Sequence, residues 1–223
     1  MNFFRLGMTA AFAALVALDV ASSARASIVF DNFAPANAFN GSNFFSIYGG
    51  SRNLDSHGEP LPDRDVAMPF IAAASAAVGT IDVAIEMLLT TGANAFDLIL
   101  LTDSGGHPGA AIESIHRAVT PGNPGVVSVD SLSHPILTAG QSYWLAASVD
   151  GMSEMSWFTN LVGDVGPVGV RDAPADWVLV DDPRGAFRVL STAPIPEPST
   201  LSLALLAAVM LAALTRGEGE RKR

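Results

Sequence analysis

The sequence of 223 residues contains no cysteine and only one lysine, Lys222. Without cysteine the protein has no disulfide bond, no thiolate nucleophile and no cysteine-ligated metal site, so burial alone must hold its core. Between Ser27 and Thr192 there are six arginines, no lysine and 18 acidic residues, a net charge of −12. Nucleic acid is therefore not expected as a partner, because its binding depends on neutralising phosphates with lysine and arginine.

Long apolar runs are confined to the two ends of the chain. The mean hydropathy is +0.36, which is high for a chain of net charge −10. Residues 1–26 contain 18 apolar side chains and residues 199–215 contain 13, whereas the remainder has an ordinary globular composition. We therefore expect one domain over residues 27–192, long enough to bury a core, between two specialised ends.

The amino end has the order of a secretory signal peptide. Arg5 supplies a positive charge, Leu6–Leu18 is an apolar run, and the small residues Ala24 and Ala26 flank one variable position. We predict that residues 1–26 are a signal peptide that is cleaved after Ala26. The alternatives are a retained membrane anchor, for which the apolar run is short, and a buried N-terminal helix.

The carboxyl end has three parts. Residues 193–200 form a proline-rich sorting motif and linker, residues 201–215 an apolar transmembrane helix, and residues 216–223 a basic cytoplasmic tail. The prolines fix φ and remove backbone donors, so we expect the first part to be extended and accessible to a protease. As a helix, the 14-residue apolar run Leu201–Leu214 would be about 21 Å long, which is short for a bilayer core. The positive-inside rule keeps the basic residues in the cytoplasm, namely Arg216, Arg221, Lys222 and Arg223.

Pro196, Glu197 and Pro198, followed by the apolar helix and the basic tail, resemble the PEP-CTERM sorting signal of Gram-negative, exopolysaccharide-producing bacteria. The resemblance covers about 30 residues. It implies recognition by an exosortase, a membrane cysteine transpeptidase, with cleavage near Pro-Glu-Pro and release or re-attachment at the surface. The alternative is a plain C-terminal anchor on a proline-rich stalk. In both cases the central domain lies outside the cytoplasm.

The central region has the periodicity of strands. Residues 81–87 alternate between apolar and polar side chains, and residues 143–149 place Trp144 opposite an apolar face. Residues 91–94 suit a hairpin turn before the next strand, and we assign residues 72–78 to a strand or its edge. Glycine- or proline-containing breaks recur roughly every ten to twenty residues. The pattern predicts an all-β domain, a single antiparallel β-sandwich of jelly-roll type, flanked by a signal helix and a transmembrane helix.

The segment Leu101–Gly109 contains Asp-Ser-Gly-Gly, which also occurs in the nucleophile loop of chymotrypsin-like proteases. Those enzymes need a histidine and an aspartate from an earlier barrel, and Ser104 lies only 47 positions after the one upstream histidine, His57. We interpret the segment as a turn. Asp103 and Ser104 would bond their own backbone, the glycines would take positive φ, and Pro108 would set the exit.

That turn, a strand near Ala111–Val119 and the segment Leu137–Leu145 together resemble the extracellular domains called choice-of-anchor, most closely the R type. This domain type pairs one sandwich with various C-terminal anchors, which agrees with the tail described above. The resemblance spans about residues 30–190. The family carries no assigned catalytic residues, so it implies none in this chain.

We predict no catalytic, cofactor-binding or metal-binding residue. The histidines occur singly, without metal-ligand spacing; they are His57, His107, His116 and His134. Two acidic pairs offer oxygen ligands for calcium but lack the spacing of a calcium loop; they are Asp63 with Asp65, and Asp181 with Asp182. A glycosidase would need two opposed carboxylates, and the sequence cannot select a pair among 18 acids.

Phe39, Phe44, Phe45 and Tyr48 cluster in a stretch rich in asparagine, glycine and serine. Exposed aromatic rings beside amide and hydroxyl groups would suit a polysaccharide-binding platform. The interpretation we favour is that alternate rings belong to the core of an early strand pair.

These features predict an exported, exosortase-processed cell-surface or extracellular-matrix protein with a non-catalytic β-sandwich, linked to exopolysaccharide or biofilm. It would be exported across the inner membrane, anchored there transiently, and then lie at the cell surface or outside the cell. The expected partners are an exosortase-like membrane protease, the membrane through the C-terminal helix before processing, and an extracellular polysaccharide; no cofactor is expected. The alternative is a carbohydrate-binding module, and a glycan-active enzyme is the least favoured of the three.

Overall fold

The computed structural model describes residues 26–49, 57–88, 94–120, 122–149, 151 and 153–192. These lie in one compact unit, Ala26–Thr192. The unit is all-β, and no α-helix occurs among the described residues. Its elements are β1 (Ile28–Asp31), the 3-10 turn η1 (Pro35–Asn37), β2 (Asn40–Tyr48), β3 (Arg64–Ile71), β4 (Ala76–Met87), β5 (Asn94–Asp103), β6 (Pro108–Val119), β7 (Gly125–Asp130), β8 (Ile136–Leu137), β9 (Ser142–Ser148), β10 (Glu154–Thr159), β11 (Val165–Asp172), β12 (Val178–Pro183) and β13 (Phe187–Ser191).

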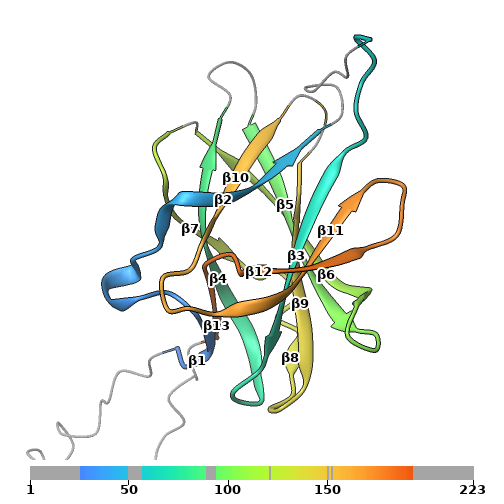
Figure 1. The fold of residues 1–223 in the computed structure, drawn as a ribbon. Coiled ribbons are helices and arrows are strands. Elements are labelled where there is room, and N and C mark those ends of the chain that lie inside the picture. The colour runs from blue at the N-terminus through green and yellow to red at the C-terminus, as the bar shows by residue number, and fades with distance from the viewer. Residues whose placement is uncertain are drawn as a thin grey trace, which may run out of the picture. The chain divides into compact units, whose positions relative to one another are not determined.

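All described strand pairs are antiparallel, and the strands form one sheet whose main path runs β1-β13-β4-β10-β2-β3-β9-β5-β6. Strand β7 and the short β8 add to β4, and β12 pairs only with β11, which itself pairs with β3. The β11–β12 hairpin extends outward beside β3 (Figure 1). Among the described residues, which omit 50–56 between these strands, β2 and β3 share a single register pair, Tyr48 with Arg64. Of the junctions along the main path, this one therefore has the fewest register pairs among the described residues.

One hydrophobic core is shared by strands from both sides of that junction. Ile81 of β4 and Phe187 of β13 belong to the same buried cluster as Leu98 of β5 and Leu145 of β9. Trp157 of β10 is also fully buried in this cluster. The sheet thus curves so that its two parts enclose a common interior (Figure 1).

The core face predicted for residues 81–87 is confirmed, because Ile81, Val83, Ile85 and Met87 are buried in the main core. The two-residue period also predicts an opposite face in water, and that part is wrong, because Asp82 and Ala84 are buried. Ala84 is buried in a second cluster around Phe158, and Asp82 is buried beside Arg188 and Ser128. Strand β4 has neighbours on both sides, β13 and β10 on one and β7 and β8 on the other. This central position in the sheet explains why β4 is buried along nearly its whole length.

The prediction for residues 143–149 is also confirmed. Leu145 faces the main core, whereas Trp144 is buried on the other face, in a third cluster that includes Leu101 and the partly buried Trp177 and Leu179. The last two residues lie just before and within β12. The outward face of β9 is therefore covered by the β11–β12 hairpin rather than by solvent.

The hairpin predicted at residues 91–94 is wrong. Strands β4 and β5 are not neighbours in the sheet, since β5 pairs with β6 and β9. The connection between them crosses from one part of the sheet to the other. Residues 72–78 contain no helix, in agreement with the assignment to a strand edge: residues 72–75 form the bend between β3 and β4, and β4 begins at Ala76.

The predicted sorting elements fall outside the described residues. This applies to Ala24, to the motif Pro196, Glu197 and Pro198, and to the basic residues Arg216, Arg221, Lys222 and Arg223. Ala26, the residue before the predicted cleavage point, is exposed and lies just before β1. In the part of the chain that the structure describes, no helix has the length and apolar character needed to span a membrane.

Candidate binding site

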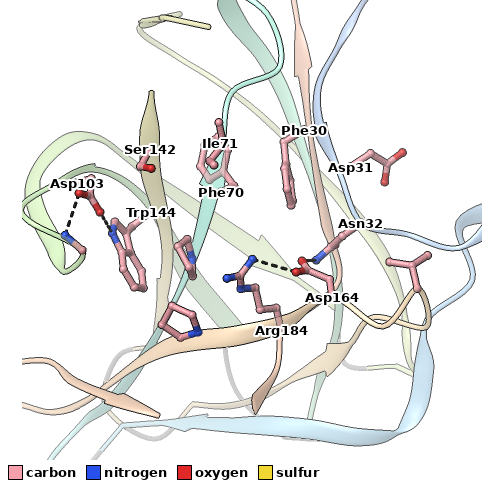
Figure 2. A pocket seen from close by; sticks show the side chains of 14 residues that line it. Phe30, Asp31, Asn32, Phe70, Ile71, Asp103, Ser142, Trp144, Asp164 and Arg184 are labelled. Carbon is pink, nitrogen blue, oxygen red and sulfur yellow. Dashed lines mark hydrogen bonds and ion pairs between the residues drawn. The ribbon is translucent and has the colours of Figure 1, made fainter. Parts of the chain in front are cut away.

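A pocket with a volume of about 490 Å³ lies where several strand ends meet (Figure 2). It is lined by the end of β1, the end of β3, the β5–β6 turn, the start of β9, the β10–β11 connection and the residue after β12. Its lining residues are Phe30, Asp31, Asn32, Pro69, Phe70, Ile71, Asp103, Gly106, Ser142, Trp144, Val162, Asp164, Pro167 and Arg184. We call it the strand-end pocket.

One wall of the strand-end pocket is a chain of polar contacts centred on Asp164. Its Oδ1 atom accepts a 2.9 Å hydrogen bond from Nη1 of Arg184, and its Oδ2 atom accepts one of 3.1 Å from the amide nitrogen of Asn32. Figure 2 shows these three side chains in a row. The buried Asn32 also donates to the carbonyl of Gly185 and accepts from the backbone N–H of Phe187. The wall is thereby fixed to the backbone beside β13.

The connection that carries Asp164 is ordered by another buried amide, that of Asn160. Its Oδ1 atom accepts hydrogen bonds from the backbone N–H groups of Val162 and Asp164. Its Nδ2 atom donates to the carbonyls of Asp164 and Arg184, at 2.7 and 2.8 Å. An asparagine that bonds nearby backbone groups is a common way to fix a loop. Asn160 therefore holds Asp164 and Arg184 side by side.

The guanidinium of Arg184 has N–H donors that are not used by protein acceptors among the described residues. Its Nη1 atom is used by Asp164, but its Nε atom is buried and has no hydrogen-bond partner among the described residues. Buried polar atoms in proteins are almost always paired, so the unpaired Nε atom is an exception among the polar groups of this wall. The guanidinium fits here because residue 166 is glycine: a Cβ atom at Gly166 would lie 2.5 Å from Nη2 of Arg184.

The opposite wall is formed by the β5–β6 turn. The indole N–H of Trp144 donates a 2.7 Å hydrogen bond to Oδ1 of Asp103, and the backbone N–H of Gly106 donates to Oδ2 at 3.0 Å (Figure 2). Gly105 and Gly106 have φ values of 64° and 84°, which favour glycine. Pro108 begins β6. The prediction for this turn is confirmed for the positive φ of the glycines, for Pro108 as its exit and for the bond of Asp103 to nearby backbone. The sequence also predicts that the Ser104 side chain bonds the backbone, but the hydrogen bonds between Ser104 and His107 join backbone atoms.

The apolar lining is partly open to solvent. Ile71 and Val162 are 60% and 53% exposed. Behind them the ring of Phe30 packs 4.6 Å from that of Phe187 and 5.4 Å from that of Phe70, between centroids. The strand-end pocket thus combines accessible aliphatic surface with fixed carboxylates, an amide and a guanidinium.

A second pocket, of about 260 Å³, lies under the β11–β12 hairpin. Its polar end is an ion pair between Asp65 and Arg171, and the Arg171 guanidinium lies 4.5 Å from the ring centre of Trp177. Burial raises the pKa of the Asp65 carboxyl, and the hydrogen bond and charge of Arg171 oppose that rise. Since Arg171 is engaged by both neighbours, we assign this pocket a structural role.

The aromatic cluster of residues 39–48, for which a core role is the favoured interpretation, is divided between two faces of the sheet. Phe45 packs against the main core, whereas its neighbour Phe44 is 46% exposed and packs edge-on against Phe158, with ring centres 5.6 Å apart. Phe39 also contacts Phe158, and Tyr48 lies under the guanidinium of Arg64 rather than in this group. Successive strand residues point to opposite faces, so the core interpretation is confirmed for Phe45 and the four rings do not form one surface.

The histidines and acidic pairs do not converge. His116 contacts Asp97 at 2.9 Å and His134 contacts the carbonyl of Val78 at 2.9 Å. Within the ranges that the structure describes, no group of three or more histidine, aspartate or glutamate side chains is arranged to hold a metal ion.

The polar wall of the strand-end pocket had no signal in the sequence. Asn32 and Asp164 are 132 positions apart, and neither lies in a recognisable motif. On the opposite wall, the sequence predicts Asp103 as a turn residue and Trp144 as a strand residue, but not the hydrogen bond between them.

No protein-family model matches the chain, and no curated protein is similar to it. The resemblances to the PEP-CTERM signal and to choice-of-anchor domains therefore rest on the residues quoted for them.

Proposed function

We propose that the chain is an exported protein that an exosortase-like protease processes at its carboxyl end, leaving a non-catalytic domain at the cell surface or in the extracellular matrix. The observation that carries the proposal is the pair of sorting sequences, residues 1–26 and 193–223, on either side of a compact all-β unit. The cysteine-free composition of that unit is compatible with a location outside the cytoplasm, because its folding needs no disulfide bond.

The finer architecture that we propose is a β-sandwich of jelly-roll type. Two observations support it: in the part of the chain that the structure describes, β2 and β3 share one register pair, and strands from both sides of that junction share a single core. Two stacked sheets with a common interior would have both properties.

In the proposed sequence of events, the chain is exported and cut after Ala26, and residues 201–215 then hold it in the inner membrane with the basic tail in the cytoplasm. The protease cuts near Pro196-Glu197-Pro198. The domain is then released or re-attached at the surface, where it associates with exopolysaccharide.

Hydrolysis is not part of this proposal. The strand-end pocket does contain Asp103 and Asp164, but both oxygen atoms of each carboxylate already accept hydrogen bonds from protein donors. A glycosidase needs one carboxyl that transfers its proton and another that attacks or activates water. Carboxylates held in this way are suited to binding hydroxyl groups instead.

Cell fractionation tests the proposal. In the producing bacterium, the wild-type chain is expected in the surface or medium fraction, shortened at both ends. A variant with Pro196, Glu197 and Pro198 changed to alanine should stay in the inner membrane with its tail uncut. Pro194→Ala, just outside the motif, is the matched control and should be processed normally. Retention of the wild-type chain in the cytoplasm, or normal processing of the triple variant, would contradict the proposal.

A second candidate function, a carbohydrate-binding module, is favoured by the strand-end pocket. Its volume of about 490 Å³ lies in the range of small-ligand sites, and its lining mixes apolar surface with oriented polar groups. Retention of the chain on the cell's own exopolysaccharide, beyond that of an unrelated acidic protein, would support this function. Equal retention of the two proteins would argue against it.

A further inference from the structure

We propose that the strand-end pocket binds one neutral sugar residue of an extracellular polysaccharide, an inference that rests on the second candidate function and gives it a site. The site would use Arg184 and Asp164 on one wall, Asp103 on the other, and the exposed side chains of Ile71 and Val162 as apolar contacts.

The first argument is that Arg184 has guanidinium N–H groups that no protein acceptor uses among the described residues. Of the guanidinium atoms of Arg184, only Nη1 is bonded to protein among the described residues, through Asp164. The enclosed Nε atom is left unpaired. Because the protein encloses Nε, a ligand oxygen would have to accept from Nη2 of this guanidinium.

The second argument is that the acceptors are oriented in advance. Asp164 is held by Arg184 and Asn32, and Asp103 is held by Trp144 and the backbone of Gly106. Each carboxylate oxygen has two lone-pair positions, so it can accept a further hydrogen bond from a ligand hydroxyl. Groups that are already fixed lose little entropy when the ligand binds.

The third argument concerns charge. Three acidic residues line the pocket, Asp31, Asp103 and Asp164, against the single arginine Arg184, and the Asp31 carboxylate lies 3.7 Å from Nη1 of Arg188 outside the lining. An anionic ligand such as a uronate or a phosphate would meet net repulsion in this site, within a region of net charge −12. A hydroxyl group both donates and accepts, so a neutral sugar matches carboxylates and guanidinium together without adding charge.

The fourth argument is the apolar surface beside these groups. Ile71 and Val162 are both more than half exposed, and Phe30 also lines the pocket. A pyranose ring presents C–H groups on its faces and hydroxyls at its edge. The lining divides in the same way, with polar walls and aliphatic side chains at the opening.

Isothermal titration calorimetry on the full chain in mild detergent tests the site. The probes are neutral disaccharides, namely cellobiose, maltose, lactose and mannobiose, with digalacturonate as the charged counterpart and trilysine as a cationic peptide. We expect saturable binding of at least one neutral disaccharide and weaker binding of digalacturonate and trilysine. No saturation by any neutral probe up to about 10 mM, or tighter binding of either charged probe, would overturn the proposal.

Variants then locate the binding. Ile71→Ala combined with Val162→Ala should weaken binding about tenfold or more, without unfolding, since both side chains are exposed. The control is Leu132→Ala combined with Ile136→Ala, which removes side chains that are 75% and 76% exposed outside the pocket. Arg184→Lys keeps the charge but removes the planar donor pair, and should also weaken binding. Equal affinity of the pocket variant and the control would overturn the assignment.

The result can be separated from the proposed sorting function. Processing at Pro196-Glu197-Pro198 is measured in cell fractions and involves no residue of the pocket. Normal processing without sugar binding would remove only the present inference, whereas sugar binding without processing would remove only the exosortase step.

Discussion

The carboxylate of Glu113 in β6 accepts a 2.7 Å hydrogen bond from the hydroxyl of Ser131, which follows β7. The same carboxylate accepts two further bonds, from the backbone N–H groups of Leu132 and Ser133, each at 2.7 Å. Strands β6 and β7 each have a single partner for most of their length, β5 and β4 respectively. Glu113 therefore ties together two segments that the sheet itself does not join.

This contact predicts a dependence of stability on pH. Burial raises the pKa of Glu113, but the hydrogen bonds from Ser133, Ser131 and Leu132 outweigh burial, so the pKa in the folded state lies below its ordinary value. The folded state thus binds the proton of this group less readily than the unfolded state. The resulting stabilisation is present above the unfolded pKa of about 4.5 and is lost as the pH falls through the folded pKa.

Glu113→Gln should lower the free energy of unfolding by about 2 kcal/mol at pH 7, and by less at pH 3, as measured by urea denaturation. Glu86→Gln, near the end of β4, is the control and should have a smaller effect. An equal loss for Glu113→Gln at both pH values would show that the charge of the carboxylate does not contribute.

A second prediction concerns Asp65 and Arg171. Asp65 is buried, and only Arg171 opposes the rise that burial causes in the pKa of its carboxyl. Arg171→Ala should cost about 3 kcal/mol at pH 7, because it leaves a buried carboxylate without its partner. The loss should grow as the pH rises above about 4, since a raised folded pKa means that ionisation disfavours the folded state.

The matched control for Arg171 is Arg64→Ala. Arg64 pairs with Asp172 through two hydrogen bonds, but the two side chains are 36% and 42% exposed. Exposed ion pairs contribute at most about 1 kcal/mol. If both arginine variants had the same effect in denaturation experiments, burial would not be the reason for the importance of Arg171.

A third prediction concerns the bond between Asp103 and Trp144. Asp103→Ala should lower the free energy of unfolding by about 2 kcal/mol, because the buried indole N–H loses its acceptor and the turn loses its bond to Gly106. In a Trp144→Phe background the same change should cost less, because no indole donor is then left unpaired. Additive effects in this double-mutant cycle would mean that the two side chains do not interact.

A fourth prediction concerns close backbone packing between β4 and β13. A Cβ atom at Gly79 would lie 2.5 Å from the carbonyl oxygen of Ser191, beside a register shift between these strands. Because that oxygen belongs to the backbone, it cannot move aside easily. Gly79→Ala should therefore destabilise the domain by about 2 kcal/mol or more in thermal or urea unfolding. Gly41→Ala, where the added Cβ meets nothing within 4 Å, should cost little.

Local patterns in the sequence predicted local structure well. The two-residue period identified the core face of β4, and the opposite positions of Trp144 and Leu145 followed from the same rule. The turn after β5 could be recognised because glycine and aspartate have specific roles in turns. These inferences needed no knowledge of which strands pair.

Inferences that depended on pairing were less reliable. The signal at residues 91–94 indicates a change of direction, but it cannot distinguish a hairpin from a crossover, and here the chain crosses over. The polar wall of the strand-end pocket was not predicted, because Asn32, Asp164 and Arg184 meet only through tertiary folding. The favoured interpretation of the aromatic stretch needed no pairing, and it is confirmed for Phe45, which packs against the core while Phe44 faces the other way.

The most direct test of the central claim is the intact mass of the mature protein purified from the surface or medium fraction. Export with processing at both ends predicts a chain that begins at Ser27 and ends close to Pro196-Glu197-Pro198, without residues 201–223 apart from any attached surface group. A mature chain that retains the basic tail to Arg223, or that still begins at Met1, would contradict it.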